Sequence, residues 1–149
     1  MAMFISRSPD ETAALGEAWG REVQPGWVLA LTGVLGAGKT QLVRGLAKGL
    51  GSPARVHSPT FVLLHIYDGG RLPLHHLDLY RLAGPQELMG AGLEDYLYAR
   101  NAVAVVEWAE RWLDDGLTAA SPGIRKLRRV RMLIGADDLR EIHYEDSGA

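Results

Sequence analysis

Gly33-Val34-Leu35-Gly36-Ala37-Gly38-Lys39-Thr40 is the stretch that decides the fold of this 149-residue chain. It matches the pattern of a phosphate-binding P-loop: a glycine, four residues of any kind, then Gly-Lys and a serine or threonine. Glycines let the backbone curl so that successive N–H groups point at phosphate oxygens, and the following helix adds its positive end. We expect Lys39 to reach the β- and γ-phosphates and the Thr40 hydroxyl to sit on Mg²⁺.

The residues on either side of this loop predict the strand and the helix that a P-loop requires. Residues 27–31 form a short apolar run bounded by Pro25-Gly26, which is typical of a buried strand. After the loop, apolar residues recur at helical spacing: Leu42, Val43, Leu46, Ala47 and Leu50. The alternative is a glycine-rich turn that merely joins strand to helix. Because strand, loop and helix occur together, the sequence favours a nucleotide site.

Length and composition predict one globular domain, residues 1–149, without a strong electrostatic field. The hydrophobic content of 47% and the charged content of 23% are ordinary for a soluble protein. A net charge of −2 gives no global basic field that would demand nucleic acid, and the absence of cysteine excludes disulfides. Because no apolar stretch is long enough for a membrane span and no signal-peptide layout is present, we expect a cytoplasmic protein without membrane contact.

The remaining segments predict an α/β protein of the P-loop NTPase fold, with a mainly parallel sheet, added antiparallel strands and helices on both faces. The N-terminal helix begins with Ser8 as N-cap, Pro9 at the first helical position and Glu11 closing a capping box. The other expected elements are strands at residues 61–67, 72–80 and 102–106, short helices within 88–97 and 109–113, and a terminal hairpin of 124–134 with 139–144. The last few residues are expected to fray.

Two acidic residues follow apolar runs and are candidates for holding Mg²⁺ and managing water beside the phosphates. Glu107 follows residues 102–106, which is the Walker-B layout of a buried strand and then an acid. Asp78 lies in His76-Leu77-Asp78-Leu79-Tyr80-Arg81, at the end of another expected strand. Each has a plainer interpretation: Glu107 as a strand-end carboxylate in solvent, and Asp78 as a helix cap or a partner for Arg81.

A hydroxyl and two adjacent histidines are further candidates. Thr60 follows Ser58-Pro59 in a loop that we expect over the phosphates, where a hydroxyl can sense the γ-phosphate. The alternative is a turn in which Thr60 caps the backbone. On a strand, His75 and His76 face opposite sides of the sheet, so they do not ligate one metal together. Their spacing therefore argues against a zinc site.

A basic run lies near the C-terminus and consists of Arg125, Lys126, Arg128, Arg129 and Arg131. We interpret these cations as lining the exposed face of an edge strand, where charge discourages aggregation. Contact with nucleic acid or with an acidic partner is the alternative interpretation.

With these motifs assembled, the chain resembles the TsaE family of bacterial ATPases, formerly called YjeE, over about residues 8–108. The motifs that carry the resemblance occur in order: residues 35–40, Ser58-Pro59-Thr60-Phe61, residues 76–81, and Glu107-Trp108. Members of this family help to make threonylcarbamoyl adenosine, the modified base beside the anticodon in tRNAs that read codons beginning with A. They act with the partner proteins TsaB and TsaD.

The resemblance implies roles for individual residues. Lys39 and Thr40 would bind phosphate and Mg²⁺, Glu107 would be a Mg²⁺ ligand, and Asp78 would be needed for hydrolysis together with Lys39. The N-terminal helix would approach the adenine at Thr12, and Arg140 would match a late family arginine, although Leu139 precedes it here instead of the family's glycine. The expected nucleotide-binding residues are Thr12, Gly33, Leu35, Gly36, Ala37, Gly38, Lys39, Thr40, Gln41, Thr60 and Arg140.

Residues and resemblance together predict a P-loop domain that binds and hydrolyses Mg-ATP to drive tRNA modification. ATP is favoured over GTP because no Asn-Lys-x-Asp or Thr-Lys-x-Asp stretch is present to read guanine. A small P-loop kinase is one alternative, but the chain has no insertion large enough for an Arg-rich lid. A nucleotide-gated binding module with incidental hydrolysis is another. We expect tRNA contact to run through the complex rather than through this mildly acidic chain.

Overall fold

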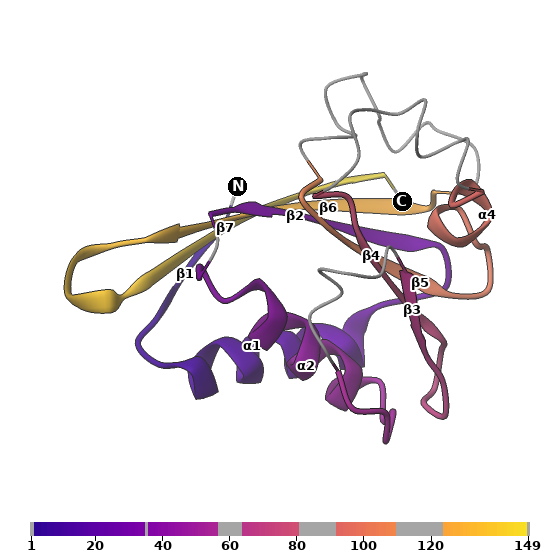
Figure 1. Ribbon diagram of the computed structural model, residues 1–149, viewed down its shortest axis with the longest axis horizontal. Coiled ribbons are helices and arrows are strands. Elements are labelled where there is room, and N and C mark those ends of the chain that lie inside the picture. The colour runs from indigo at the N-terminus through magenta and orange to yellow at the C-terminus, as the bar shows by residue number, and fades with distance from the viewer. Residues whose placement is uncertain (1, 35, 57–63, 81–91, 110–123, 149) are drawn as a thin grey trace.

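The computed structural model describes residues 2–34, 36–56, 64–80, 92–109 and 124–148, which build one sheet with helices packed against it (Figure 1). The elements are β1 (Ala2–Ser6), α1 (Pro9–Glu22), β2 (Trp27–Gly33), α2 (Lys39–Gly49), β3 (Leu64–Tyr67), β4 (Leu74–Asp78), α4 (Glu94–Leu97), β5 (Val103–Glu107), β6 (Lys126–Ile134), the 3₁₀ turn η1 (Ala136–Asp138) and β7 (Arg140–Gly148). No helix within these described ranges is long and apolar enough to cross a membrane.

The sheet combines a parallel centre with antiparallel edges. Its seven described strands run in the order β1-β7-β6-β2-β5-β4-β3. The four strands β6, β2, β5 and β4 run parallel to one another, whereas β3, β7 and β1 are each joined by antiparallel pairing. This arrangement confirms the predicted α/β fold with a mixed sheet. The β3–β4 pair and the β6–β7 hairpin are both antiparallel, as the turn residues between them predicted.

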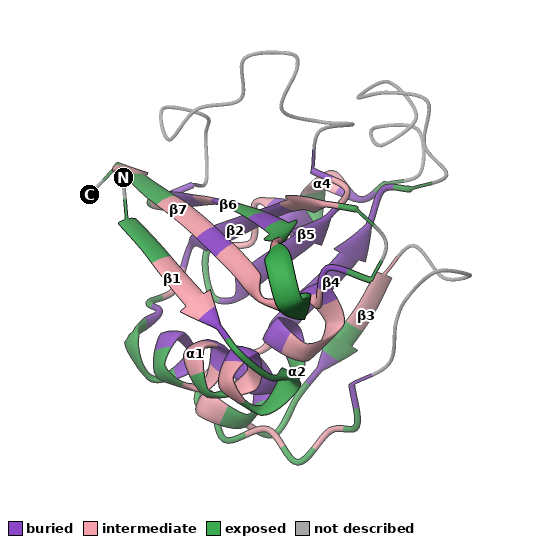
Figure 2. Cartoon of the chain, turned by 90° about the vertical axis from the view of Figure 1, so that its left-hand side faces the viewer, coloured by how far each residue is buried: buried purple, intermediate pink, exposed green. Residues whose placement is uncertain are grey.

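The core lies on both faces of the sheet. Helices α1 and α2 cover one face, where Leu29 of β2 packs with Leu46 of α2. On the opposite face, Val28 of β2 belongs to the same cluster as Leu97 of the one-turn helix α4. Strands β4 and β5 are buried along their whole length, whereas β1 and β7 carry exposed residues (Figure 2). A strand buried on both faces explains why β5 reads as an uninterrupted apolar run.

Helices α1 and α2 touch through their backbones. Gly16 and Gly20 of α1 face Gly45 and Gly49 of α2, each pair spaced so that both glycines share one helix face. A Cβ added at Gly45 would lie 1.9 Å from the carbonyl oxygen of Ala13, so no other residue fits there without separating the helices. This seam, which the sequence analysis did not identify, ties α1 to the helix that follows the P-loop.

The structure of both ends of the chain differs from what the sequence predicted. The Ser8 hydroxyl accepts from the Glu11 N–H at 3.1 Å, as predicted, but the Glu11 carboxylate accepts from the N–H of Arg7 instead of closing the box on Ser8. Residues 2–6 form β1, an edge strand on β7 that was not predicted. The expectation of a frayed C-terminus was wrong for the described residues, because β7 stays paired with β6 up to Gly148.

The interpretation of the basic run was also wrong. Strand β6 lies inside the sheet, between β7 and β2, and Arg128 is only 3% exposed. Its guanidinium donates two hydrogen bonds to Asp146, at 2.6 and 2.8 Å, and a third to Glu22 at 3.3 Å. It also packs against the rings of Trp19, Trp27 and Tyr144. These partners lie far from Arg128 along the chain, so a local run of cations gives no indication that one of them is buried.

Candidate functional site

The glycine-rich P-loop connects the C-terminal end of β2 to the first residue of α2. Gly38 caps α2 with a φ of +100°, and Gly33 has a φ of +147°. A Cβ at Gly33 would also lie 2.6 Å from the carbonyl oxygen of Met132 on β6. Both positions therefore require glycine because of their positive φ, and Gly33 requires it also because there is no room for a Cβ. Leu35, which the sequence analysis placed in the loop, lies outside the described residues.

Lys39 is held beneath this loop, at the start of α2. It is only 5% exposed, and its ammonium group donates a hydrogen bond to the Gly33 carbonyl at 2.6 Å. The same ammonium group lies 4.0 Å from the centroid of the Trp108 ring, within cation–π range. Trp108 has a φ of +58°, which is strained for a residue with a large side chain. The tryptophan after Glu107 therefore packs directly on the P-loop lysine.

The two predicted acids lie side by side at the ends of neighbouring parallel strands. Asp78 ends β4, Glu107 ends β5, and the two are register partners. They are 5% and 4% exposed, and their strands place them on the face that α1 and α2 cover. Oδ1 of Asp78 accepts from the N–H of Tyr80 at 2.9 Å, whereas Oε2 of Glu107 lies 2.5 Å from Nε2 of His76. Glu107 is therefore not the solvent-facing carboxylate of its plainer interpretation, whereas Arg81, the suggested partner of Asp78, lies outside the described residues.

The electrostatic environment of Asp78 differs from that of an ordinary surface aspartate. Burial raises the pKa of Asp78, because desolvation disfavours its charged form. The hydrogen bond from the Tyr80 N–H opposes this shift, the Glu107 carboxylate raises the pKa further, and His76 and Lys39 lower it. The net direction is upward, so Asp78 is a better proton acceptor than an exposed aspartate once it is ionised.

The oxygen atoms around the loop fit a hard cation such as Mg²⁺. Within the described part of the chain, no hydrogen bond reaches Oε1 of Glu107, Oδ2 of Asp78 or the hydroxyl of Thr40. Carboxylate and hydroxyl oxygens are the ligands that Mg²⁺ prefers, and it usually completes its shell with water and substrate phosphates. No group of three or more His, Cys, Asp or Glu residues forms a metal cage among the described residues. The donor set thus fits a cation that phosphates help to hold.

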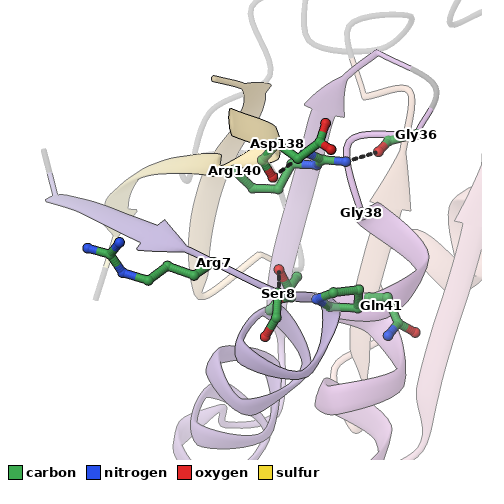
Figure 3. Close-up of a pocket in the computed structure, with 9 residues that line it drawn as sticks. Arg7, Ser8, Gly36, Gly38, Gln41, Asp138 and Arg140 are labelled. Atoms are coloured by element: carbon green, nitrogen blue, oxygen red, sulfur yellow. Dashed lines mark hydrogen bonds between the residues drawn. The ribbon is translucent and has the colours of Figure 1, made fainter. Parts of the chain in front are cut away.

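A pocket of about 430 Å³ opens between α1, the P-loop and the tip of the β6–β7 hairpin (Figure 3). Five residues predicted to bind the nucleotide line it: Thr12, Gly36, Gly38, Gln41 and Arg140. Arg7, Ser8, Pro9 and Asp138 also line it, and the sequence analysis did not identify them as site residues. The structure therefore brings together predicted residues that lie more than a hundred positions apart.

Arg140 reaches the P-loop from the far end of the chain. It donates hydrogen bonds to the carbonyl oxygens of Asp138, at 2.7 Å, and of Gly36, at 3.3 Å (Figure 3). Asp137 and Asp138 both have positive φ, so the tip of the hairpin turns sharply just before Arg140. Thr12 lies deeper, 2% exposed, with its hydroxyl 2.6 Å from that of Ser6.

The predicted residues divide into two groups around the loop. Lys39, Asp78 and Glu107 are buried under it, whereas the five pocket residues surround its open side. Ala37 is fully buried in the loop, and Thr40 is half-buried at the start of α2. Thr60 and the helix expected at residues 109–113 fall outside the described residues, apart from Ala109, and only α4 is described of the helices expected at 88–97.

His76 and Trp108 are the neighbours of the buried group to which the sequence analysis gave no role. The spacing of His76 and Asp78 was a usable signal, because residues two apart on a strand share a face. His75 faces the other way, with Nδ1 at 2.9 Å from the carbonyl oxygen of Tyr96, so the two histidines separate as predicted.

The sheet, the glycine loop and the lysine at the start of α2 define a P-loop NTPase-like fold of the α/β class. Residues 6–134 match the family model of the threonylcarbamoyl adenosine biosynthesis protein TsaE, so the chain belongs to the TsaE family.

Individual relatives agree with this assignment. The chain is 46% identical over 107 residues to the tRNA threonylcarbamoyladenosine biosynthesis protein TsaE of Treponema pallidum (strain Nichols), covering 72% of this chain and 78% of the relative. It is 46% identical over 114 residues to the TsaE protein of Nostoc sp. (strain PCC 7120), covering 74% and 70%. The crystal structure of YdiB from Bacillus subtilis superposes with a TM-score of 0.77 at 30% identity, covering 99% of this chain and 86% of that one.

Proposed function

We propose that this protein is a Mg²⁺-dependent ATPase that acts in the biosynthesis of threonylcarbamoyladenosine in tRNA. Its relatives carry the name of that pathway, and the family match spans residues 6–134. In this proposal residues 1–149 form one ATPase domain in the cytoplasm, which works with TsaB and TsaD and meets tRNA through their complex.

One observation carries the ATPase part of the proposal. A buried lysine at a glycine loop lies close enough to Asp78 to affect its pKa, Asp78 is the register partner of Glu107, and each acid keeps one oxygen free of hydrogen bonds from the described residues. A nucleoside triphosphate with its cation would bring phosphate anions to Lys39 and a cation to the two carboxylates. Burying like charges side by side is otherwise costly, so the arrangement indicates a charged ligand.

The buried residues would divide the chemistry among themselves. Lys39 would bind the β- and γ-phosphates, and Thr40 with Glu107 would hold Mg²⁺. The cation, when bound, would neutralise charge that develops on the phosphate oxygens. Asp78 would orient a water molecule and accept its proton, for which its raised pKa is favourable.

The pocket would hold the nucleoside half of ATP. Its lining contains backbone and side-chain hydrogen-bonding groups from the start of α1, the loop, α2 and the hairpin, including those of Ser8, Gln41 and Arg140. The glycine seam between α1 and α2 would keep the two sides of this pocket at a fixed spacing. A partner that contacts α1 and the hairpin tip would therefore be sensitive to whether the pocket holds ATP or its hydrolysis product.

The experiment that tests this proposal compares Lys39→Ala with Lys48→Ala, a control on the same helix whose side chain is 75% exposed. Losing a charge-assisted contact of about 1.5–3 kcal/mol should weaken ATP binding roughly ten- to a hundredfold and abolish phosphate release. Lys48→Ala should behave as the wild type does. Unchanged ATP affinity and turnover in Lys39→Ala, or no ATP binding by the wild type, would refute the proposal.

A second test concerns the partners. We expect the isolated protein to hydrolyse ATP slowly, because the described residues supply no lid that would exclude water from the pocket. Phosphate release should rise when TsaB and TsaD are added, and tRNA modification in the reconstituted system should fail with Lys39→Ala. Fast turnover that the partners leave unaltered would contradict this part of the proposal.

A further inference from the structure

A row of hydrogen-bonded side chains crosses three strands and ends at Glu107. The hydroxyl of Tyr67 on β3 lies 3.1 Å from Nδ1 of His76 on β4, and Nε2 of His76 lies 2.5 Å from Oε2 of Glu107 on β5. The imidazole is fully buried, and Tyr67 is 4% exposed. Water therefore does not substitute for either contact, and the ring position is set by the protein alone.

The direction of these hydrogen bonds follows from the chemistry of the groups. An ionised carboxylate only accepts hydrogen bonds, so Nε2 of His76 must carry the proton that lies between it and Glu107. In the neutral ring Nδ1 is then an acceptor, and the Tyr67 hydroxyl donates to it. The carboxylate of Glu107 thus sets the nitrogen that carries the proton, and Tyr67 helps to fix the orientation of the ring.

Glu107 needs such support more than Asp78 does. Asp78 has a short side chain, and its Oδ1 is held by the backbone N–H of Tyr80. Glu107 has one more rotatable bond, and His76 is the sole hydrogen-bond partner of its carboxylate among the described residues. Because Oε2 is engaged by His76, Oε1 is the oxygen that remains for a ligand. Without His76, the carboxylate would lose its fixed orientation.

We propose that His76 is a positioning residue, which holds Oε2 of Glu107 so that Oε1 is presented to the divalent cation of a bound nucleotide, while Tyr67 holds His76. This inference rests on the proposed function and adds two residues to it. Hydrogen bonds that orient a metal ligand in this way typically contribute ten- to a hundredfold to metal affinity.

The experiment measures ATP affinity twice for each variant, with EDTA and with saturating Mg²⁺, and takes the ratio as the strengthening due to Mg²⁺. His76→Leu should lower this ratio about ten- to a hundredfold and leave the EDTA affinity unchanged. His76→Gln should recover most of the loss, because its amide nitrogen can still donate to Glu107. Tyr67→Phe should cause a smaller loss in the same direction.

His75→Leu is the matched control, since His75 is the adjacent histidine on the opposite face of β4 and bonds only to the Tyr96 carbonyl among the described residues. Its Mg²⁺ ratio should equal that of the wild type. A wild-type ratio retained in His76→Leu and Tyr67→Phe would overturn the inference while leaving the proposed function intact. Wild-type protein that binds ATP in neither condition would overturn both.

A measurement without ligand guards against a His76→Leu variant that does not fold. Long-range ¹H–¹⁵N NMR spectra of the wild-type protein should show a proton on Nε2 of His76, and Tyr67→Phe should shift the signal of Nδ1. A proton on Nδ1 alone would overturn the inference, because Nε2 would then have nothing to donate to Glu107.

Discussion

Two clusters of charged residues lie on the same face of the sheet, and they differ in how the buried charge of their carboxylates is balanced. Under the P-loop, Asp78 and Glu107 lie side by side, and the pKa of Asp78 is raised by burial and by its acidic neighbour. Between β6 and β7, Arg128 binds Asp146 with two hydrogen bonds and lowers the pKa of that carboxyl. In the first cluster the effect of burial on Asp78 outweighs the groups that lower its pKa, whereas in the second cluster the carboxylate is paired with a guanidinium.

This difference separates a binding site from a structural contact. A paired carboxylate stabilises the folded chain and has nothing to gain from a ligand. An uncompensated one destabilises the fold slightly and is stabilised when a cation arrives. We therefore expect substitutions in the first cluster to act mainly on ligand binding or turnover, and substitutions in the second to act on stability.

The largest expected effect is on the binding of Mg²⁺. We expect Mg²⁺ to strengthen ATP binding, and in Glu107→Gln this strengthening should be smaller by a factor of about ten to a hundred or more. The reason is that an amide replaces a charged metal ligand. The matched carboxylate-to-amide change in the other cluster, Asp146→Asn, should leave the strengthening by Mg²⁺ unchanged. Calorimetric titration of ATP with and without Mg²⁺ measures both, and the distinction fails if Asp146→Asn shows the loss or Glu107→Gln does not.

The second-largest expected effect is a loss of stability when the pair of Arg128 and Asp146 is broken. Asp146→Ala should lower the free energy of unfolding by about 2 kcal/mol, because the 3.3 Å contact to Glu22 then remains as the one carboxylate contact of the buried Arg128 guanidinium among the described residues. Urea denaturation should show no comparable loss for Glu145→Ala, the exposed neighbour on the same strand. Equal stability of the two variants would mean that Asp146 does not support Arg128.

This stabilisation should depend on pH in a defined direction. The pKa of Asp146 is lowered in the folded state, chiefly by the hydrogen bond from Arg128. Its contribution is therefore present above the unfolded pKa of about 3.9 and is lost as the pH falls through the lower folded value. The stability difference between wild type and Asp146→Ala should shrink below about pH 4. A difference that grows on acidification would contradict this sign.

The smallest expected effect is a gain in stability when Asp78 is replaced, in contrast to the loss expected for Asp146. The pKa of Asp78 is raised in the folded state, chiefly by burial, so ionised Asp78 costs stability at any pH above that raised value. Asp78→Asn, which keeps an acceptor for the Tyr80 N–H, should raise the Tm of the ligand-free protein at pH 7 by up to a few degrees. The gain should vanish below about pH 4, where the carboxyl is protonated in both states. A lower Tm at pH 7 would show that Asp78 is adequately compensated.

The parts of the site that the sequence predicted are those that local pattern determines. The glycine loop requires positive φ and close backbone approach at fixed positions, so its residues are recognisable in one stretch. Glu107 and Asp78 follow strands whose apolar pattern is visible, and parallel strands that share a sheet end at the same edge. Both acids could therefore be placed beside Lys39 before the fold was known.

The parts that sequence reasoning missed depend on contacts between distant segments. The burial of Arg128 depends on Asp146 and Glu22, and the bond between His76 and Glu107 joins residues 31 positions apart. The seam of Gly16 and Gly20 on Gly45 and Gly49 looks like ordinary glycine content until the helices are paired. The family resemblance supplied Thr12 and Arg140, which the pocket brings together and which local pattern did not single out.

The most direct test of the central claim is to measure ATP binding and phosphate release on the same samples of Asp78→Ala and wild type. The account predicts that Asp78→Ala binds Mg-ATP about as well as the wild type, since Lys39, Thr40 and Glu107 remain, and releases phosphate at least about a hundredfold more slowly, as expected for the loss of a general base. Phosphate release at the wild-type rate would contradict it, and so would loss of ATP binding without loss of folding.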